Sequence, residues 1–219
     1  MSTQTQPSRG RADLLKDSPV MFESRVLDKL SRVHPVVVPL IFVPAIVVFA
    51  WLALQRISVL PAIGFAVGGY VFWTLTEYWL HRVVFHFEPD KGIGARLHWI
   101  IHGVHHDHPN DPLRLVMPPS VSVPLAAIFF GLFWLVLPAG AAFAVAVGFF
   151  AGYLNYDMTH YYVHHRTPKS AAGRKLRELH MRHHFQDHTK GFGVSAPWWD
   201  LVFRTASKKR RRAEAPSQP

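Results

Sequence analysis

"PVVVPLIFVPAIVVFAWLAL", residues 35–54, is an apolar run without a charged side chain. A helix of about twenty apolar residues is long enough to cross the hydrocarbon core of a bilayer. Three further apolar runs follow, and a Pro138–Gly140 break marks the junction between the last two. The sequence therefore predicts an all-α membrane protein with four transmembrane helices in two hairpins, at about 35–54, 59–80, 121–137 and 139–157. A soluble protein with buried core helices is the alternative, and the length of the uncharged runs argues against it.

The second apolar run carries three glycines, Gly64, Gly68 and Gly69. Small residues let membrane helices approach one another closely. We therefore expect these glycines to lie at a contact between spans.

The basic residues lie beside the apolar runs. The chain has 24 Lys and Arg against 14 Asp and Glu, and all of these Lys and Arg except Arg56 lie in 1–34, in 81–119 or after residue 160. Basic residues mark the cytoplasmic side of a membrane protein, so we expect these three segments, and both termini, to be cytoplasmic. This placement also suits a membrane protein better than a nucleic-acid-binding one. We expect a polar, basic N-terminal segment at 1–34, a membrane domain at 35–205 and a disordered basic tail at 206–219.

The chain has no cysteine, which excludes disulfides, thiolate catalysis and metal sites built from cysteine. The absence of cysteine and of eukaryotic retention signals favours a bacterial inner membrane.

Histidines gather in four clusters, all on the predicted cytoplasmic side. Two clusters have the spacing i, i+3, i+4, one has i, i+4, and the first has two histidines five residues apart. Residues three and four apart share a helical face, so three segments are expected to present imidazoles in one direction. The five-residue spacing does not fit a regular helix, and it predicts that the second span ends or distorts there. The members are His81, His86, His102, His105, His106, His160, His164, His180, His183 and His184.

Neutral imidazole binds iron, zinc or copper through nitrogen. Ten imidazoles are too many for one ion and suit two ions with room for an exogenous ligand. Five carboxylates near the clusters could accept the free ring N–H of a ligand histidine and fix its orientation, and Asp157 is the strongest candidate for that role. The five are Glu77, Asp107, Asp157, Glu178 and Asp187. The chain has no H-E-x-x-H, G-x-S-x-G or P-loop motif, so zinc-protease, serine-hydrolase and nucleotide chemistry are not indicated.

Five stretches resemble the fatty acid 2-hydroxylase branch of the membrane fatty acid hydroxylase and sterol desaturase superfamily. They are "EYWLHRVVFH" (77–86), "HGVHHDHPNDPLRLVMPP" (102–119), "YDMTHYYVHH" (156–165), "LHMRHH" (179–184) and "GFGVSAPWWDLVFRT" (191–205). The resemblance implies a four-span bundle with a cytosolic helical cap that holds a dimetal site. It assigns the ten histidines above as the metal ligands, and leaves His34, His98, His108, His165 and His188 unassigned.

The resemblance also implies the chemistry: two iron ions, replaced by zinc in some isolated proteins, use O2 and external electrons to hydroxylate a lipid acyl chain at C2. The lipid is a fatty acid or a ceramide-like acyl lipid, so the protein would serve lipid metabolism. Many eukaryotic members carry a fused cytochrome b5 domain. The segment before the first span is too short for one, so we expect a separate donor of the cytochrome b5 or ferredoxin type.

Two other readings remain open from the sequence. One is a carotenoid or sterol hydroxylase or desaturase of the same superfamily, with the same metals and another substrate. The second is a membrane protein that binds or transports metal without catalysis. Transporters place polar ligands near the middle of the membrane, whereas these histidines lie at or beyond the ends of the apolar runs.

Overall fold

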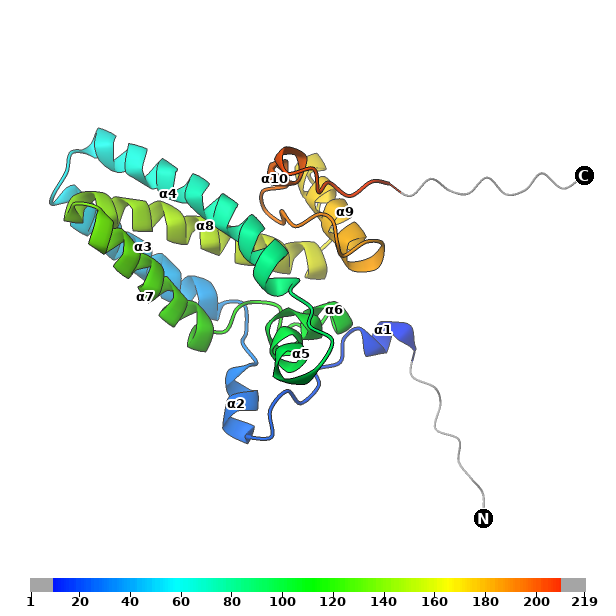
Figure 1. Cartoon of the computed structure of the whole chain (residues 1–219). Coiled ribbons are helices and arrows are strands. Elements are labelled where there is room, and N and C mark those ends of the chain that lie inside the picture. The colour runs from blue at the N-terminus through cyan, green and yellow to red at the C-terminus, as the bar shows by residue number, and fades with distance from the viewer. Residues whose placement is uncertain (1–9, 210–219) are drawn as a thin grey trace, which may run out of the picture.

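The structure is a computed structural model that describes residues 10–209. Four long helices form its body (Figure 1). They are α3 (Val37–Leu54), α4 (Val59–Trp79), α7 (Pro119–Val136) and α8 (Ala139–His165). All four are long and apolar enough to cross a membrane. Within the described range all regular secondary structure is helical. The predicted all-α membrane fold is therefore confirmed.

Helix α8 is the centre of the bundle. Of the 18-residue apolar stretch of α8 that could span the membrane, 67% is buried inside the protein. The corresponding share is 11–22% for the other three spans. Helices α3, α4 and α7 all pack against it. Its lipid exposure is low because the other spans cover it. Its many Ala and Gly residues let those spans approach closely.

Helices α4 and α8 approach each other backbone to backbone at Gly69 and Gly148. A Cβ on Gly69 would lie 2.1 Å from a carbonyl oxygen of α8, and one on Gly148 would lie 1.7 Å from a carbonyl oxygen of α4. A Cβ on Gly64 or Gly68 would meet nothing within 4 Å. The expectation that all three glycines of the second span lie at a helix contact is thus right for Gly69 and wrong for Gly64 and Gly68. Those two lie one turn apart and face away from α8.

A cap of short helices covers one end of the bundle, and the α3–α4 and α7–α8 turns lie at the other end (Figure 1). The cap contains η1 (Leu80–Phe85), α5 (Gly92–His98), η2 (Trp99–Gly103), α6 (Val104–Asp107), α9 (Ala171–Phe185) and α10 (Trp198–Val202). Helix α4 continues into η1, and α8 runs beyond residue 157 to His165. Both long helices therefore carry histidines directly from the membrane bundle into the cap.

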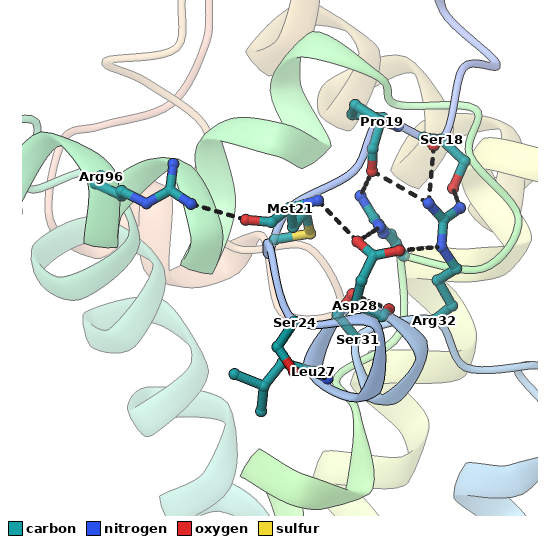
Figure 2. Close-up of polar contacts among 10 residues, drawn as sticks. Ser18, Pro19, Met21, Ser24, Leu27, Asp28, Ser31, Arg32 and Arg96 are labelled. Carbon is teal, nitrogen blue, oxygen red and sulfur yellow. Dashed lines mark hydrogen bonds and ion pairs between the residues drawn. The ribbon is translucent and has the colours of Figure 1, made fainter.

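Residues 10–34 of the N-terminal segment are part of the folded unit. They contain α1 (Arg11–Leu14) and α2 (Arg25–Leu30). Arg96 of the cap donates to the carbonyl oxygen of Met21 at 2.9 Å, as Figure 2 shows. The Asp28 carboxylate accepts from the Met21 N–H at 2.8 Å and from Arg114 at 2.8 Å. The sequence indicated only a polar, basic segment here. Of the predicted tail at 206–219, everything from residue 210 onward lies outside the described residues.

Candidate metal centre

Ten histidines form two compact groups between the bundle and the cap. Within each group, every histidine offers a ring nitrogen that lies within 4.8 Å of those of the other four. Group A consists of His81, His86, His102, His106 and His183. Group B consists of His105, His160, His164, His180 and His184. The structure thus brings together all ten histidines that the sequence singled out.

A stretch of π-helix brings His81 and His86 into the same group. The backbone N–H of His86 donates to the carbonyl oxygen of His81 at 3.2 Å, which is an i to i+5 bond. This wider turn places residues five apart on one side, and such turns are frequent at functional sites. The distortion predicted from the five-residue spacing is therefore confirmed.

Each i, i+4 pair of histidines shares a group, and the i+3 residue joins the other group. His102 and His106 lie 3.0 Å apart, Nε2 to Nε2, in group A. His105 instead contacts His184 of group B, at 3.0 Å. The same division occurs in α9, where His183 alone belongs to group A. The expectation that each segment points its imidazoles in one direction is wrong in this respect, because successive residues of an α-helix point about 100° apart.

The tautomers of two group A rings leave lone pairs aimed at the centre of the group. Nδ1 of His81 lies 2.7 Å from the Phe192 carbonyl oxygen, and Nδ1 of His183 lies 2.8 Å from that of Lys190. A carbonyl oxygen only accepts hydrogen bonds, so each Nδ1 carries the proton and each Nε2 carries the lone pair. These Nε2 atoms lie 3.2 Å from His102 Nε2 and 3.0 Å from His86 Nε2.

Converging ring nitrogens fit a cation better than they fit one another. In group B, Nε2 of His160 is buried and has no hydrogen-bond partner among residues 10–209. His164 and His180 face each other at 2.8 Å, Nε2 to Nε2. A metal ion within each group would satisfy nitrogens that otherwise crowd or stay unpaired. The residues present therefore fit a two-metal site.

Burial keeps five of the grouped imidazoles in the cap neutral. It lowers the pKa of His105 and of His183 to about 3 each. It also holds the pKa of His102, His180 and His184 well below the ordinary value, with neighbouring imidazoles adding to the effect. Only neutral imidazole binds a metal, so these rings are in the required state at neutral pH.

The other five histidines lie outside both groups. His98, on the same helical face as His102 in the sequence, has its Nε2 3.9 Å from a Glu88 oxygen. His188 lies 3.7 Å from the other Glu88 oxygen. The Nδ1 of His108 contacts the Leu14 carbonyl oxygen. The remaining two are His34, which accepts from the Val36 N–H, and His165, whose ring contacts that of Tyr161 at a tilt of 32°.

The five carboxylates proposed as partners of ligand histidines have other partners. Asp157 accepts from the Tyr153 hydroxyl at 3.2 Å and from the Met117 N–H at 3.4 Å. Among the described residues, no carboxylate of the five is hydrogen-bonded to a ring nitrogen of group A or B. The partners of the other four are Ser195 for Glu77, Trp99 for Asp107, Lys175 and Arg182 for Glu178, and Thr189 for Asp187.

Glu88 is the carboxylate that does contact a grouped histidine. Its Oε1 lies 3.1 Å from Nδ1 of His86. Burial lowers the pKa of His86, and the Glu88 carboxylate opposes that effect. Glu88 follows His86 by two residues in the sequence, and this proximity was the only signal that could have pointed to it.

The described part of the protein has two hollows, one within the bundle and one beside group A. One is a small apolar cavity of about 20 Å³ within the bundle, lined by side chains that include Trp73, Phe149 and Tyr153. The second is a polar cleft of about 230 Å³ lined by Arg82, His86 and Lys190, among others. The cleft therefore reaches group A, whereas the cavity lies among the spans.

Residues 65–205 match the model of the fatty acid hydroxylase family. The chain belongs to this family. It is 36% identical to the dihydroceramide fatty acyl 2-hydroxylase FAH2 of Arabidopsis thaliana, over 86% of this chain and 80% of the plant protein. It is 40% identical to the ceramide very long chain fatty acid hydroxylase SCS7 of Saccharomyces cerevisiae, over 82% of this chain and 47% of the yeast protein.

The fold of this fatty acid hydroxylase is also that of a solved relative. The structure of full-length scs7p, in which the hydroxylase domain is visible, superposes with a TM-score of 0.80 at 38% identity. The match covers 83% of this chain and 70% of that one. The resemblance drawn from the histidine motifs is thus confirmed. The protein is an integral-membrane oxidoreductase with histidine groups that can hold metal.

Proposed function

We propose that this fatty acid hydroxylase inserts one atom of O2 at C2 of a ceramide-like acyl lipid, using two iron ions held by groups A and B. One oxygen atom enters the C–H bond at C2, and the other leaves as water with two electrons from an external donor and two protons. The observation that carries the proposal is the pair of five-histidine groups. The chain's relatives include proteins named as fatty acyl or fatty acid 2-hydroxylases.

The chain supplies the metal-binding groups and their positions. When bound, the irons supply the O2 activation that breaks an unactivated C–H bond, which protein side chains cannot do alone. The ten histidines would hold the two ions side by side, because His105 and His106 are adjacent in the chain and belong to different groups. The low pKa values of the buried cap imidazoles keep them neutral for this purpose.

The apolar side chains around the cavity suit the acyl chain of the substrate. At about 20 Å³ the cavity is smaller than such a chain, so the spans would have to separate to admit it. The cavity lies between α3, α4, α7 and α8, and its wall includes Tyr153. The Tyr153 hydroxyl donates to Asp157, which precedes the group B residue His160 by three positions. A chain entering from the bilayer would pass between these apolar side chains toward the histidines without leaving an apolar environment.

We place the cap and both termini in the cytoplasm, because basic residues gather on that side of the bundle. A separate protein of the cytochrome b5 or ferredoxin type would supply the electrons. A bacterial inner membrane stays a prediction from the sequence, and the relatives named above come from a plant and a yeast.

Incubation under ¹⁸O2 tests the reaction. The purified protein, loaded with iron and supplied with an electron donor and a ceramide, is expected to yield a product that carries a single ¹⁸O atom on C2. A product hydroxylated at another carbon, or one that has lost hydrogen without gaining oxygen, would contradict the proposed reaction. Parallel incubations with a sterol and a carotenoid are expected to give no product.

A further inference from the structure

The two histidine groups differ in the hydrogen-bond acceptors available to Nδ1, the ring nitrogen that points away from the group. In group A, three of the five rings are hydrogen-bonded through Nδ1 to an acceptor outside the group. These are His81 to the Phe192 carbonyl at 2.7 Å, His183 to the Lys190 carbonyl at 2.8 Å and His86 to the Glu88 carboxylate at 3.1 Å.

Group B lacks such acceptors in the described part of the chain. Nδ1 of His164, of His180 and of His184 is buried and has no hydrogen-bond partner among residues 10–209. When Nε2 of such a ring binds a metal, Nδ1 must carry the proton. That buried N–H then stays unsatisfied, which disfavours metal binding by the ring.

The acceptors of group A are themselves held in place. The Asp200 carboxylate accepts from the N–H groups of Phe192 and Gly193, at 2.9 Å each. Gly191, between the two carbonyls, adopts a φ of +78° and donates to the Thr205 carbonyl oxygen at 2.8 Å. The loop therefore offers its carbonyl groups to group A in a geometry that these contacts fix.

Hydrogen bonds to the outer nitrogen of a ligand histidine fix its tautomer and raise its basicity, and their loss typically lowers metal affinity 10- to 100-fold. From this contrast, and given the proposed binding of one ion by each group, we propose that the two metal positions are unequal. Group A is the tight position, and Glu88 with the loop 190–193 acts as its positioning apparatus. Group B is the weak position, which gives up its ion first.

Graded chelation tests the inequality without measuring activity. The purified full chain is loaded with Zn²⁺, dialysed against increasing EDTA, and its zinc per chain is measured by mass spectrometry. We expect two release steps separated by about tenfold or more in chelator concentration. His164→Ala, in group B, should lack the first step and keep the second.

Substitutions at Glu88 test whether the second release step comes from group A. Glu88→Ala should move only the second step, to about tenfold lower EDTA, and Glu88→Gln, which keeps an oxygen acceptor for His86, should restore part of the shift. Asp90→Ala is the matched control, since it removes an exposed carboxylate from the same connection, and it should move neither step. A purely structural effect of Glu88→Ala would shift both steps together and would not be relieved by Gln.

Other outcomes overturn the inference in distinguishable ways. Release of both ions in one step, earlier release from group A, or an unchanged second step in Glu88→Ala would show that the positions are not unequal in this way. A chain that never holds two zinc ions at saturation would instead refute the proposed two-metal function.

Discussion

His105 and His106 are neighbours in the sequence, yet their ring nitrogens belong to different metal-binding groups. Nε2 of His105 lies 3.0 Å from His184, and Nε2 of His106 lies 3.0 Å from His102. One peptide unit therefore links the two proposed metal positions. The divergence of adjacent side chains on a helix is enough to place two ions side by side.

Single substitutions at this pair should each empty one position. His105→Ala and His106→Ala are both expected to lower the metal content of the saturated protein from about two ions per chain to about one, because each removes a ligand from a different group. Metal analysis of the purified variants checks this. His34→Ala, at an exposed histidine outside both groups, should keep the full content. Equal metal content in all three variants would contradict the division into two groups.

Gly148 should tolerate no side chain. Gly148→Ala puts a Cβ against a carbonyl oxygen of α4, where it would lie at 1.7 Å without movement. We expect a loss of about 2 kcal/mol or more from overpacking, seen as a lower thermal unfolding midpoint in detergent. Gly68→Ala adds the same methyl group where nothing lies within 4 Å, and its midpoint should stay close to that of the parent. A Gly148→Ala midpoint as high as that of Gly68→Ala would show that α4 and α8 are not in backbone contact.

Gly191→Ala should disturb the loop that serves group A. The positive φ of +78° is strained for alanine by about 1–2 kcal/mol, although the added Cβ itself would have room, with its nearest neighbours at 3.7 Å. We expect zinc to leave group A at several-fold lower EDTA, because the Lys190 and Phe192 carbonyls shift. The same substitution should leave the release from group B unchanged. Unaltered release of both ions would show that the loop geometry does not support metal binding.

Asp28 should stabilise the N-terminal segment in a pH-dependent way. Its hydrogen bond from the Met21 N–H lowers its pKa, against an opposing effect of burial and with help from Arg32 and Arg114. Because the folded-state pKa lies below the unfolded value, the contribution is fully present above about pH 4 and is lost as the pH falls through the folded-state value. Asp28→Asn should cost about 2 kcal/mol at pH 7, as the loss of hydrogen bonds to a charged group.

Thermal unfolding of the parent and of Asp28→Asn across this pH range checks the prediction. The difference between their midpoints should shrink as the pH falls below about 4. A difference that stays constant with pH would mean that the charge of Asp28 contributes nothing.

The sequence was sufficient for the fold class and for the set of grouped histidines, because both depend on local patterns. Span length and charge placement predict the bundle, and short histidine spacings identify the ten residues. The outer partners of the rings could not be predicted in the same way. Two of them are backbone carbonyls, at Lys190 and Phe192, and backbone atoms leave no mark in the sequence. Gly148, which meets the backbone of α4, lies in a segment of Ala, Gly, Val and Phe that gives no sign of which residue makes this contact.

The docking of the N-terminal segment was also beyond sequence reasoning. Its central interaction joins Asp28 to Arg114, two residues far apart in the chain. Charged residues in a basic segment next to a membrane are more often solvated than paired. Only the folded arrangement shows that Arg114 is buried beneath this segment.

Mass spectrometry of total lipids tests the central claim most directly. Cells that supply an electron donor would express either the parent chain or the double variant His105→Ala, His106→Ala, which removes one ligand from each group. The account predicts 2-hydroxyacyl lipids in cells with the parent chain and none above background with the variant, at equal protein levels. If the variant produced as much 2-hydroxyacyl lipid as the parent chain, the two histidine groups would not be the catalytic centre.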